Sequence, residues 1–590
     1  MKNFFKMVFA SMVGMVLSFF VIFIFLFVIV AAIVASVDNE KVKVDNNSVI
    51  DMSLDHPIHE RSSKNPFDKL DFGGLDKNKS IGLNDILTSI KRAKADEKIK
   101  GIYLDVSSLQ SGMATTEEIR NALIDFKKSG KFIISYSEVY SQGAYYLASV
   151  ADKIYLNPEG ILEFKGLGTE LSFFKGTLDK LEIEAQVIKV GTYKSAVEPF
   201  ILTQMSNANR EQVTSFLGSM YDHFLTAVAS SRKMRKDSLF SIANQLKIQQ
   251  AADAVRYKLA DGLRYKDQVL DELKTRTGRK KDEEMNSVTL ADYIKNNPSG
   301  DDTDDAKNTI AVVYASGEIM GGEGTDETIG SERISRAIRK ARTDDKVKAL
   351  VLRVNSPGGS ALASDVIWRE VVLTKKVKPV IVSMGDVAAS GGYYIACGAD
   401  SIFAQPNTIT GSIGVFGIIP NMQKFFNNKL GITFDRVKTA EFADLGSVTR
   451  PLKDNERLII QNEVNRIYDT FTKRVASGRK KQQTYVNEIG QGRVWSGTEA
   501  LRNGLVDKLG NIDDAVRSAA KMAKLTDYEV VAYPKQKDAF QSLFDSSDDK
   551  LKDYFTKKEL GEHYQYYQQL KSALKFTGIQ TRMPYTIIIK

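Results

Sequence analysis

A serine followed by two glycines stands in the stretch SMGDVAASGGYYIA, residues 383–396. Ser390 follows the apolar run PVIVSM, which is typical of a buried strand. Such a hydroxyl is either a small residue at a tight turn or a nucleophile. A nucleophilic serine needs a base that takes its proton, so the rest of the chain must decide between the two interpretations.

A glycine pair follows a second apolar run, in the stretch NSPGGS at residues 355–360. Glycine lets backbone N–H groups approach a ligand because no Cβ intervenes, and two such groups aimed at one point form an oxyanion hole. If both runs are parallel strands, Gly358, Gly359 and Ser390 share the carboxyl edge of a sheet, where α/β proteins bind ligands. We therefore predict one site there; a plain turn at the glycines is the alternative.

Histidine is the usual base, but none of the four histidines is well placed. His56 and His59 lie in a polar segment, and His563 lies in the tail. His223, within MYDHFL, reads as a residue on a helix face. A Ser-His-Asp triad is therefore unsupported.

Lysine is the other candidate base, and the stretch VGTYKSAVEPF carries Lys194 just after the strand-like EAQVIKV. With an ordinary pKa of about 10.4, only about one lysine in 2,500 is neutral at pH 7. Burial can lower that pKa by up to about 3–5 units. Ser412, in TITGSIGV, could orient the amine without restoring its charge. A surface pair between Lys194 and Glu198 is the alternative.

The chain repeats itself. Residues 81–108 correspond to residues 329–356 at an offset of 248 positions, and residues 137–158 correspond to 385–406 at the same offset. Self-similarity at a fixed distance predicts homologous domains. Both copies alternate helix-spaced apolar residues with short apolar runs, so each is expected to be an α/β unit with largely parallel strands.

The two copies differ where chemistry is expected. Ser390 corresponds to Gln142, and Lys194 corresponds to Glu441 or Phe442. The glycine pair of the second copy is also missing from the first, where the residues are Gln110 and Ser111. This reciprocal loss predicts one composite site, to which the first copy contributes the amine and the second the hydroxyl and the glycines.

The N-terminus carries a long apolar segment without a charged residue from Val8 to Val37. About 20 apolar residues span a bilayer, whereas a cleaved signal peptide has an apolar region of about 7–15 residues. We therefore predict an uncleaved anchor, with a buried core helix as the alternative. The lysines on both sides are too evenly distributed to give the orientation: Lys2, Lys6, Lys41 and Lys43.

The bulk composition excludes several classes. A chain of 590 residues is too long for one core. No stripe of basic and aromatic residues accompanies the net charge of +9, so nucleic acid is a poor partner. Cys397 is the single cysteine, which excludes an intrachain disulfide, and no Cys/His spacing suits zinc. The predicted order is an anchor at 1–40, a linker at 41–80, the first repeat at 81–275, a linker at 276–308, the second repeat at 309–525 and a helical tail at 526–590.

Taken in order, these motifs resemble the signal peptide peptidase A family in its long, duplicated form, a group of serine peptidases with a Ser/Lys dyad. The resemblance covers about 50 to 530 and rests on VGTYKSAVEPF, VLRVNSPGGS, SMGDVAASGGYYIA, NTITGSIGV and GRVWSGTEALRNGLVDKLG. It implies two tandem Clp/crotonase-like α/β domains after a single N-terminal transmembrane helix.

The resemblance also implies residue roles. Ser390 is expected to be the nucleophile, Lys194 the general base and Ser412 the residue that hydrogen-bonds the lysine. The oxyanion hole is expected from three glycines, Gly358, Gly359 and Gly391. Asp386, four residues before the serine, either pairs with the lysine or lies outside the site.

The same resemblance implies an enzyme of the inner (plasma) membrane with its catalytic domains on the periplasmic or extracytoplasmic side. Its expected substrates are remnant signal peptides or other short unfolded peptides, and its expected assembly is a homo-oligomeric ring, a tetramer. No metal or cofactor is expected, and no Walker A motif is present for ATP-driven unfolding. The alternatives are a crotonase-type acyl-CoA enzyme and a catalytically inactive membrane scaffold.

Overall fold

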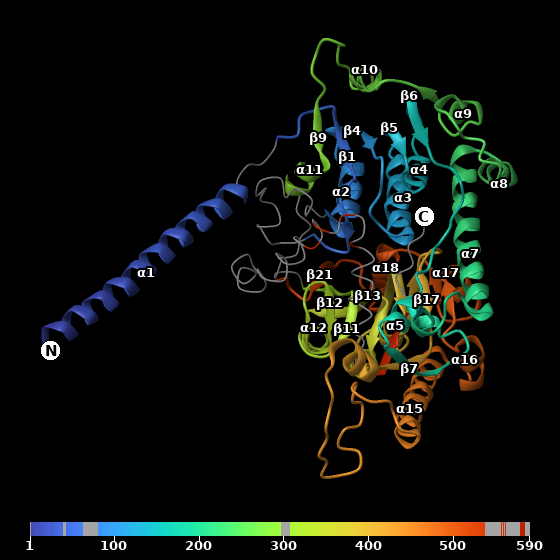
Figure 1. Cartoon of the computed structure of the whole chain (residues 1–590). Helices are drawn as coiled ribbons and strands as arrows, with labels where there is room; N and C mark the ends of the chain where they lie inside the picture. The colour runs from blue at the N-terminus through green and yellow to red at the C-terminus, as the bar shows by residue number, and fades with distance from the viewer. Residues whose placement is uncertain are drawn as a thin grey trace.

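The computed structural model describes residues 2–38, 43–62, 81–296, 307–536 and 579–583, with the isolated positions 556, 559, 561 and 564. Helix α1 (Lys2–Asp38) extends away from the rest of the chain (Figure 1). Within it, Asn3–Phe25 is long and apolar enough to cross a membrane, and the rest of the chain buries none of its most apolar window. The alternative of a buried core helix is therefore wrong.

The first repeat is built on a sheet in which all paired neighbours are parallel. Its strand order is β8 (Gly262–Leu263), β6 (Lys153–Leu162), β5 (Phe132–Tyr140), β4 (Ile99–Asp105), β1 (Ser48–Ser53) and β9 (Ser287–Thr289). Helix α2 (Leu83–Ala95) buries Ile86, Leu87 and Ile90 in the core of this repeat, as the helical spacing predicts.

The second repeat has the equivalent sheet. Its order is β19 (Val494–Ser496), β17 (Ile409–Gly411), β15 (Val380–Ala389), β13 (Val347–Ser356), β10 (Thr309–Ser316) and β21 (Glu529–Tyr533), and β16 (Ser401–Ala404) links β15 to β20 (Lys508–Leu509). The run from β10 through β13 and β15 repeats the run from β1 through β4 and β5. Two α/β units of one fold follow one N-terminal apolar helix, which confirms the predicted fold class.

A third sheet joins the repeats. Its order is β12 (Thr328–Gly330), β11 (Glu318–Met320), β14 (Gly358–Ser360), β22 (Ile579–Arg582), β18 (Val415–Asn421) and β7 (Glu184–Val190). Strand β7 belongs to the first repeat, yet it pairs antiparallel with β18 of the second along its whole length. The chain after β7 is thereby carried to the carboxyl edge of the second repeat's sheet.

The remaining elements surround these sheets, and Figure 1 shows α7 running alongside both halves of the chain. They are β2 (Ile58–His59), β3 (Ile81–Gly82), α3 (Met113–Lys127), α4 (Gln142–Ala148), α5 (Lys175–Lys180), η3 (Ser195–Val197), α6 (Glu198–Ile201), α7 (Asn207–Arg232), α8 (Lys236–Asn244), α9 (Ala251–Arg256), α10 (Lys266–Arg276), α11 (Leu290–Asn296), α12 (Ser331–Thr343), α13 (Ala361–Lys375), α14 (Gly391–Ala396), η4 (Phe425–Lys429), α15 (Asp454–Arg479), α16 (Gln483–Ile489), α17 (Gly497–Arg502) and α18 (Ile512–Met522).

Three segments differ from the predicted boundaries. The segment 41–80 contributes β1, a buried strand of the first sheet, and the segment 276–308 contributes β9 and α11. The predicted helical tail at 526–590 contributes strands β21 and β22, while most of it lies outside the described residues. These strands are short, and their pairing depends on sheets formed by distant residues, so local periodicity could not identify them.

A buried ion cluster also connects the repeats. Arg353 of β13 is fully buried; its Nε donates to Glu60 at 2.8 Å, and its guanidinium lies 2.8 Å from the carboxylate of Glu118 on α3. Burial raises the pKa of Glu118 to about 7, against the opposing effect of Arg353. A single cation from the second repeat thus serves two carboxyl groups from the N-terminal half of the chain.

Candidate active site

Ser390 is the residue between strand β15 and helix α14. It has φ 55° and ψ −112°, a backbone conformation that non-glycine residues seldom adopt and that costs on the order of 1–3 kcal/mol. A Cβ on Gly392 would lie 2.6 Å from the carbonyl oxygen of Ser356, and a Cβ on Gly391 would lie 2.7 Å from Ser364 Oγ. The two glycines after the serine are therefore required for the helix to start this close to β13.

Lys194 reaches this serine from the first repeat. The distance between Lys194 Nζ and Ser390 Oγ is 2.9 Å, and both residues are fully buried. The antiparallel register of β7 on β18 places Val190 opposite Val415, so the lysine follows directly at the seam between the repeats. The structure thus brings together the two residues that the sequence assigned to different copies.

The lysine side chain is accommodated by glycines. A Cβ on Gly492 would lie 2.6 Å from the backbone nitrogen of Lys194, and a Cβ on Gly414 would lie 3.1 Å from its Cδ. Burial removes water from the ammonium group and holds the pKa of Lys194 well below its ordinary value. Glu198 instead accepts hydrogen bonds from Ser206 and Asn209, so the alternative of a Lys194–Glu198 surface pair is wrong.

Ser412 is the second hydroxyl near the lysine. Lys194 Nζ lies 3.2 Å from Ser412 Oγ and 3.4 Å from its carbonyl oxygen. Ser412 has φ 49°, and its own N–H donates to the carbonyl of Arg493 at 2.7 Å. The amine is therefore held between two hydroxyl groups and one carbonyl.

Two of the three predicted glycines, Gly358 and Gly391, meet next to Ser390, and Gly359 pairs with the neighbouring strand. Gly358 has φ 95°, and a Cβ on it would lie 2.7 Å from the backbone nitrogen of Gly391. Gly359 pairs with Ile319 of β11, where a Cβ would collide with the backbone. The Gly358 N–H donates to Ser356 Oγ at 3.1 Å. The backbones of Gly358 and Gly391 thus meet at one point next to the serine.

Two other candidate residues lie elsewhere. Asp386 accepts hydrogen bonds from the backbone N–H and the hydroxyl of Thr115, at 2.9 and 2.5 Å, and burial raises its pKa. Of the two placements left open for this carboxyl group, the one outside the site is observed, because its partner is Thr115 and not Lys194. His223 lies on α7 with its Nε2 3.3 Å from Glu117, as expected of a residue on a helix face.

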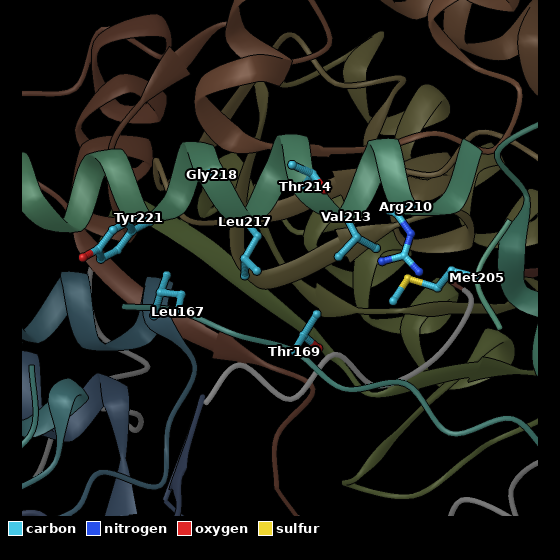
Figure 2. A pocket seen from close by; sticks show the side chains of 9 residues that line it. All are labelled: Leu167, Thr169, Met205, Arg210, Val213, Thr214, Leu217, Gly218 and Tyr221. Carbon is cyan, nitrogen blue, oxygen red and sulfur yellow. The ribbon is translucent and has the colours of Figure 1, made fainter. Parts of the chain in front are cut away.

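A cavity of about 350 Å³ lies along α7 (Figure 2), and its lining joins apolar side chains to Arg210, Thr169 and Thr214. Among its lining residues, Val213 is buried in the same cluster as Ala389, the neighbour of Ser390, and Leu167, Met205 and Leu217 pack against that cluster. Sequence reasoning missed this cavity because its lining joins Leu167 and Thr169 to α7 residues some 40 or more positions later in the first repeat. It also missed strand β22, although the apolar residues among GIQTRMPYTIII are a usable signal.

A hydroxyl and a buried amine at the carboxyl edge of a parallel sheet form an arrangement suited to covalent catalysis by an activated nucleophile. The chain belongs to peptidase family S49, whose model matches residues 125–280 and 373–526. It is therefore a serine protease, and the resemblance drawn from the sequence motifs is confirmed.

Relatives of known name agree with this assignment. Protease 4 of Salmonella typhi is 40% identical over 474 residues, which cover 79% of this chain and 76% of that protein. The chloroplastic serine protease SPPA of Arabidopsis thaliana is 34% identical, over 76% of this chain and 67% of that protein. Among solved structures, a ClpP1 mutant from Listeria monocytogenes aligns with 35% of this chain and 94% of its own, at 17% identity and a TM-score of 0.24.

Proposed function

We propose that the chain is a membrane-anchored serine endopeptidase that uses Ser390 and Lys194 as a dyad to degrade remnant signal peptides or other short unfolded peptides. The observation that carries the proposal is the 2.9 Å distance between Lys194 Nζ and Ser390 Oγ in a fully buried setting. A buried amine with a lowered pKa is available as a base near neutral pH, whereas an exposed lysine is not.

The mechanism follows from this geometry. Neutral Lys194 takes the proton of Ser390 as the hydroxyl oxygen attacks the carbonyl carbon of a peptide bond. Backbone N–H groups of the glycine cluster stabilise the resulting oxyanion. Lys194 then protonates the leaving amine, and water hydrolyses the acyl-enzyme by the same path. Ser412 holds the amine in position through both steps.

A test of the dyad needs a readout of the serine itself. Labelling by a fluorophosphonate probe should be strong in the wild type, absent in Ser390→Ala and reduced by at least about 10³-fold in rate in Lys194→Ala. Each variant should keep the wild-type circular dichroism spectrum. Undiminished labelling of a folded Lys194→Ala would contradict the role of the base.

The proposed location is the cytoplasmic membrane, with α1 as an uncleaved anchor and both repeats on the extracytoplasmic side. The exposed apolar length of α1 supports the anchor, and peptides left in the bilayer would then lie close to the protease. A phosphatase reporter fused after Lys590 should be active, and the mature protein should keep its N-terminus. A reporter without phosphatase activity, or a mature protein that lacks α1, would contradict the proposed location.

We also propose that copies of the chain assemble head to tail into a ring, a tetramer. In the first repeat, β7 pairs with β18 of the next repeat along the chain. Its counterpart in the second repeat, residues 432–438, belongs to no strand among the described residues, and Val437 there is 98% exposed. If the β7–β18 contact is repeated between chains, residues 432–438 of one copy pair with residues 167–173 of another. Such head-to-tail contacts form a ring when the rotation from one copy to the next closes.

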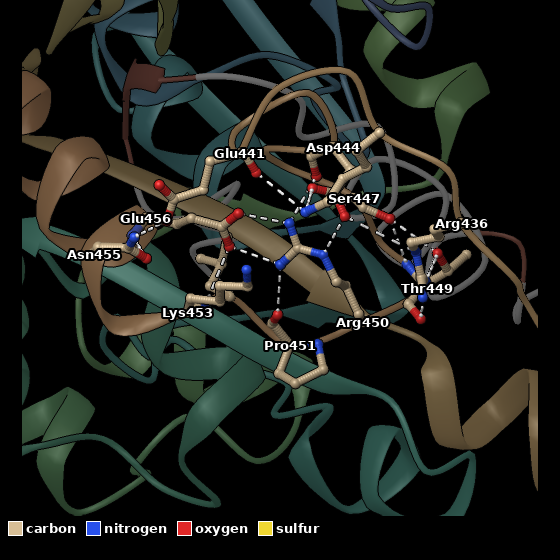
Figure 3. Close-up of polar contacts among 12 residues, drawn as sticks. Arg436, Glu441, Asp444, Ser447, Thr449, Arg450, Pro451, Lys453, Asn455 and Glu456 are labelled. Carbon is tan, nitrogen blue, oxygen red and sulfur yellow. Dashed lines mark hydrogen bonds and ion pairs between the residues drawn. The ribbon is translucent and has the colours of Figure 1, made fainter.

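Hydrogen bonds of two arginines hold the loop that contains residues 432–438 in a defined shape. Arg450 donates to Asp444 at 2.7 Å and to both carboxylate oxygens of Glu456 at 2.7 and 2.6 Å, while Arg436 donates to Thr449 (Figure 3). This bracing leaves a group of exposed apolar side chains on the loop: Leu430, Ile432, Phe434, Val437, Phe442, Leu445 and Val448. Apolar groups gathered in this way mark a surface for protein contacts.

The ring proposal predicts a change in particle mass. Val437→Asp combined with Phe434→Asp should reduce the mass measured by light scattering from that of four chains to that of one. Val377→Asp, at an exposed valine outside the loop, is the matched control and should leave the mass unchanged. A double variant that keeps the mass of the wild type would show that this loop is not the contact.

A further inference from the structure

Gln212 lies near the start of α7, and its side chain is buried between the two repeats. Its Nε2 donates to the carbonyl oxygen of Tyr193 at 3.2 Å and to Ser195 Oγ at 2.9 Å. Its Oε1 accepts the N–H of Val494 at 3.1 Å. One buried amide therefore joins the residues on either side of Lys194 to a strand of the second repeat.

The segment that carries Lys194 is a turn between β7 and η3. The N–H of Lys194 donates back to the carbonyl of Gly191 at 3.2 Å, and the N–H of Tyr193 donates to the carbonyl of Gln491 at 2.8 Å. A single turn lacks the repeated backbone hydrogen bonds of a helix or a strand. The side-chain bonds of Gln212 on both sides of the lysine therefore help to fix where the amine lies.

The strand on the other side of Gln212 is β19, the end strand of the second repeat's sheet. The residue before Val494 is Arg493, whose carbonyl accepts the N–H of Ser412 at 2.7 Å. Ser412 Oγ in turn lies 3.2 Å from Lys194 Nζ. Gln212 is thus bonded to both segments that hold the amine, one from each repeat.

The charged groups around this turn have partners of their own. Glu211 accepts from Arg493 at 2.9 Å, and the Arg493 guanidinium lies over the rings of Tyr193 and Trp495, at 4.7 and 4.4 Å from their centroids. Glu198, described above, accepts from Ser206 and Asn209. Both carboxylates are thereby held away from the amine, and the neutral amide of Gln212 connects the lysine turn to β19 without adding a charge beside the base.

The second repeat has no such amide at the equivalent place. Helices α7 and α15 each contain 26 residues and correspond at an offset of 247 positions, which puts Ile459 opposite Gln212. The side chain of Ile459 is 43% exposed, whereas that of Gln212 is 1% exposed. The buried amide therefore occurs in the copy that supplies the lysine and is replaced by an exposed apolar residue in the copy that does not.

We propose that Gln212 is a positioning residue for the base: it holds the turn of Lys194 against β19 so that the amine meets Ser390. This inference rests on the proposed dyad and adds a residue that acts through Lys194 rather than on the substrate. A buried polar group whose hydrogen bonds are all made specifies one geometry. Misplacement of a reacting group by about 1 Å can lower a rate by about 10²-fold.

The test uses Gln212→Met in the full chain, because methionine keeps the length of the side chain and removes the amide. The rate of fluorophosphonate labelling and kcat should both fall by about 10–10²-fold, with KM within about threefold of the wild type. A loosened turn admits water to the amine and reduces the effect of burial on its pKa, so the rising limb of the pH profile should move to higher pH. Gln212→Asn, which is too short to bridge both segments, should show the same changes in smaller size.

Two control variants separate positioning from a general loss of stability. Gln461→Met removes a glutamine of α15 whose amide donates to Asn465 of the same helix, and it should leave labelling and the pH profile unchanged. Val228→Ala removes packing from the other end of α7, where Val228 is buried in the core of the first repeat. It should lower the thermal midpoint and leave the labelling rate and the limb where they are in the wild type.

The outcomes for Gln212 and for the dyad can be told apart. If Lys194→Ala loses labelling while folded Gln212→Met and Gln212→Asn keep the wild-type rate and pH profile, the positioning role is overturned and the dyad stands. The same holds if Val228→Ala, at an equal loss of thermal midpoint, moves the limb as far as Gln212→Met does. If Lys194→Ala labels like the wild type, the dyad itself is refuted.

Discussion

The two repeats share a strand order but differ in the residue that follows the equivalent strands β5 and β15. In the second repeat, Ser390 takes a strained conformation and faces Lys194. In the first, Gln142 occupies the equivalent position, and its amide accepts from the N–H groups of Lys165 and Gly166 and donates to the carbonyl of Gly166. The same fold position thus holds a reactive hydroxyl in one copy and a satisfied amide that fastens a loop in the other.

The two copies of the duplicated domain divide one site between them. The first repeat keeps the segment that crosses to its neighbour, because β7 pairs with β18 and carries Lys194 to the seam. The second keeps the serine and the glycines but has no strand at 432–438 in the described structure. Neither copy holds both the amine and the hydroxyl, so a reaction needs the interface between them.

The largest expected effect comes from removing the amine at this interface. Lys194→Met keeps the apolar length of the side chain, so the fold should persist while kcat/KM falls by about 10⁴ or more, as for loss of one member of a catalytic unit. The matched change in the first repeat is Gln142→Ser. It should retain activity within about tenfold, and in a Ser390→Ala background it should restore none, because the partners of Gln142 in the described part of the chain are backbone groups of Lys165 and Gly166 and not a lysine amine.

Cleavage by Ser390→Ala combined with Gln142→Ser would contradict the division of the site. The measurement is peptide cleavage in steady state with thermal unfolding as the check on folding.

The next effect concerns the seam itself. Arg353→Met should lower the free energy of unfolding by about 3–5 kcal/mol, because Glu60 and Glu118 then remain buried without their cation. Asp105 is the first-repeat counterpart of Arg353 and pairs with Lys266 at a partly exposed site. Asp105→Asn should therefore cost no more than about 1 kcal/mol. Urea unfolding measures both; equal losses would show that the buried cluster contributes nothing specific.

Much of this arrangement could be predicted from the sequence, because the duplication supplied an internal comparison. The offset of 248 positions exposed the exchange of Ser390 for Gln142, and the small residues around it indicated a turn. The pairing of Lys194 with Ser390 followed from reciprocal loss, although no local pattern records the register of β7 on β18. The fold class followed from alternating apolar periodicities in both copies.

Other features could not be predicted because they arise between distant segments. Strand β22 gains its partners only between β14 and β18, whereas the sequence predicted a helical tail over 526–590. The collision that a Cβ on Gly492 would make with Lys194 joins residues from opposite repeats. The hydrogen bonds of Asp386 with Thr115 likewise depend on how the repeats dock.

A smaller loss is expected from the glycine cluster. Gly358→Ala places a Cβ at φ 95° beside the backbone nitrogen of Gly391, so kcat should fall by about 10²–10³, as for loss of one oxyanion donor. Gln110→Ala changes the equivalent residue of the first repeat and should leave kcat within about threefold. A Gly358→Ala enzyme with unchanged kcat and a raised KM would assign this glycine to strand binding instead.

The smallest effect is a displacement of the pH profile. Because the folded-state pKa of Lys194 is lowered by burial, the neutral base appears at a lower pH than in a free lysine, and kcat/KM should rise with pH through that lowered value. Ser412→Asp puts a carboxylate beside the amine; an opposite charge favours the ammonium form and raises its pKa, so the rising limb should move to higher pH by about one unit or more. Ser412→Ala should lower kcat about tenfold by loosening the amine, with a smaller movement of the rising limb.

The first-repeat counterpart of Ser412, Phe164, is an aromatic core residue packed on Tyr145 and Phe224, so the polar position at Ser412 is a property of the reactive copy alone. A limb that moved to lower pH in Ser412→Asp would mean that the titrating group is a different residue, and the assignment of Lys194 as the base would fail with it.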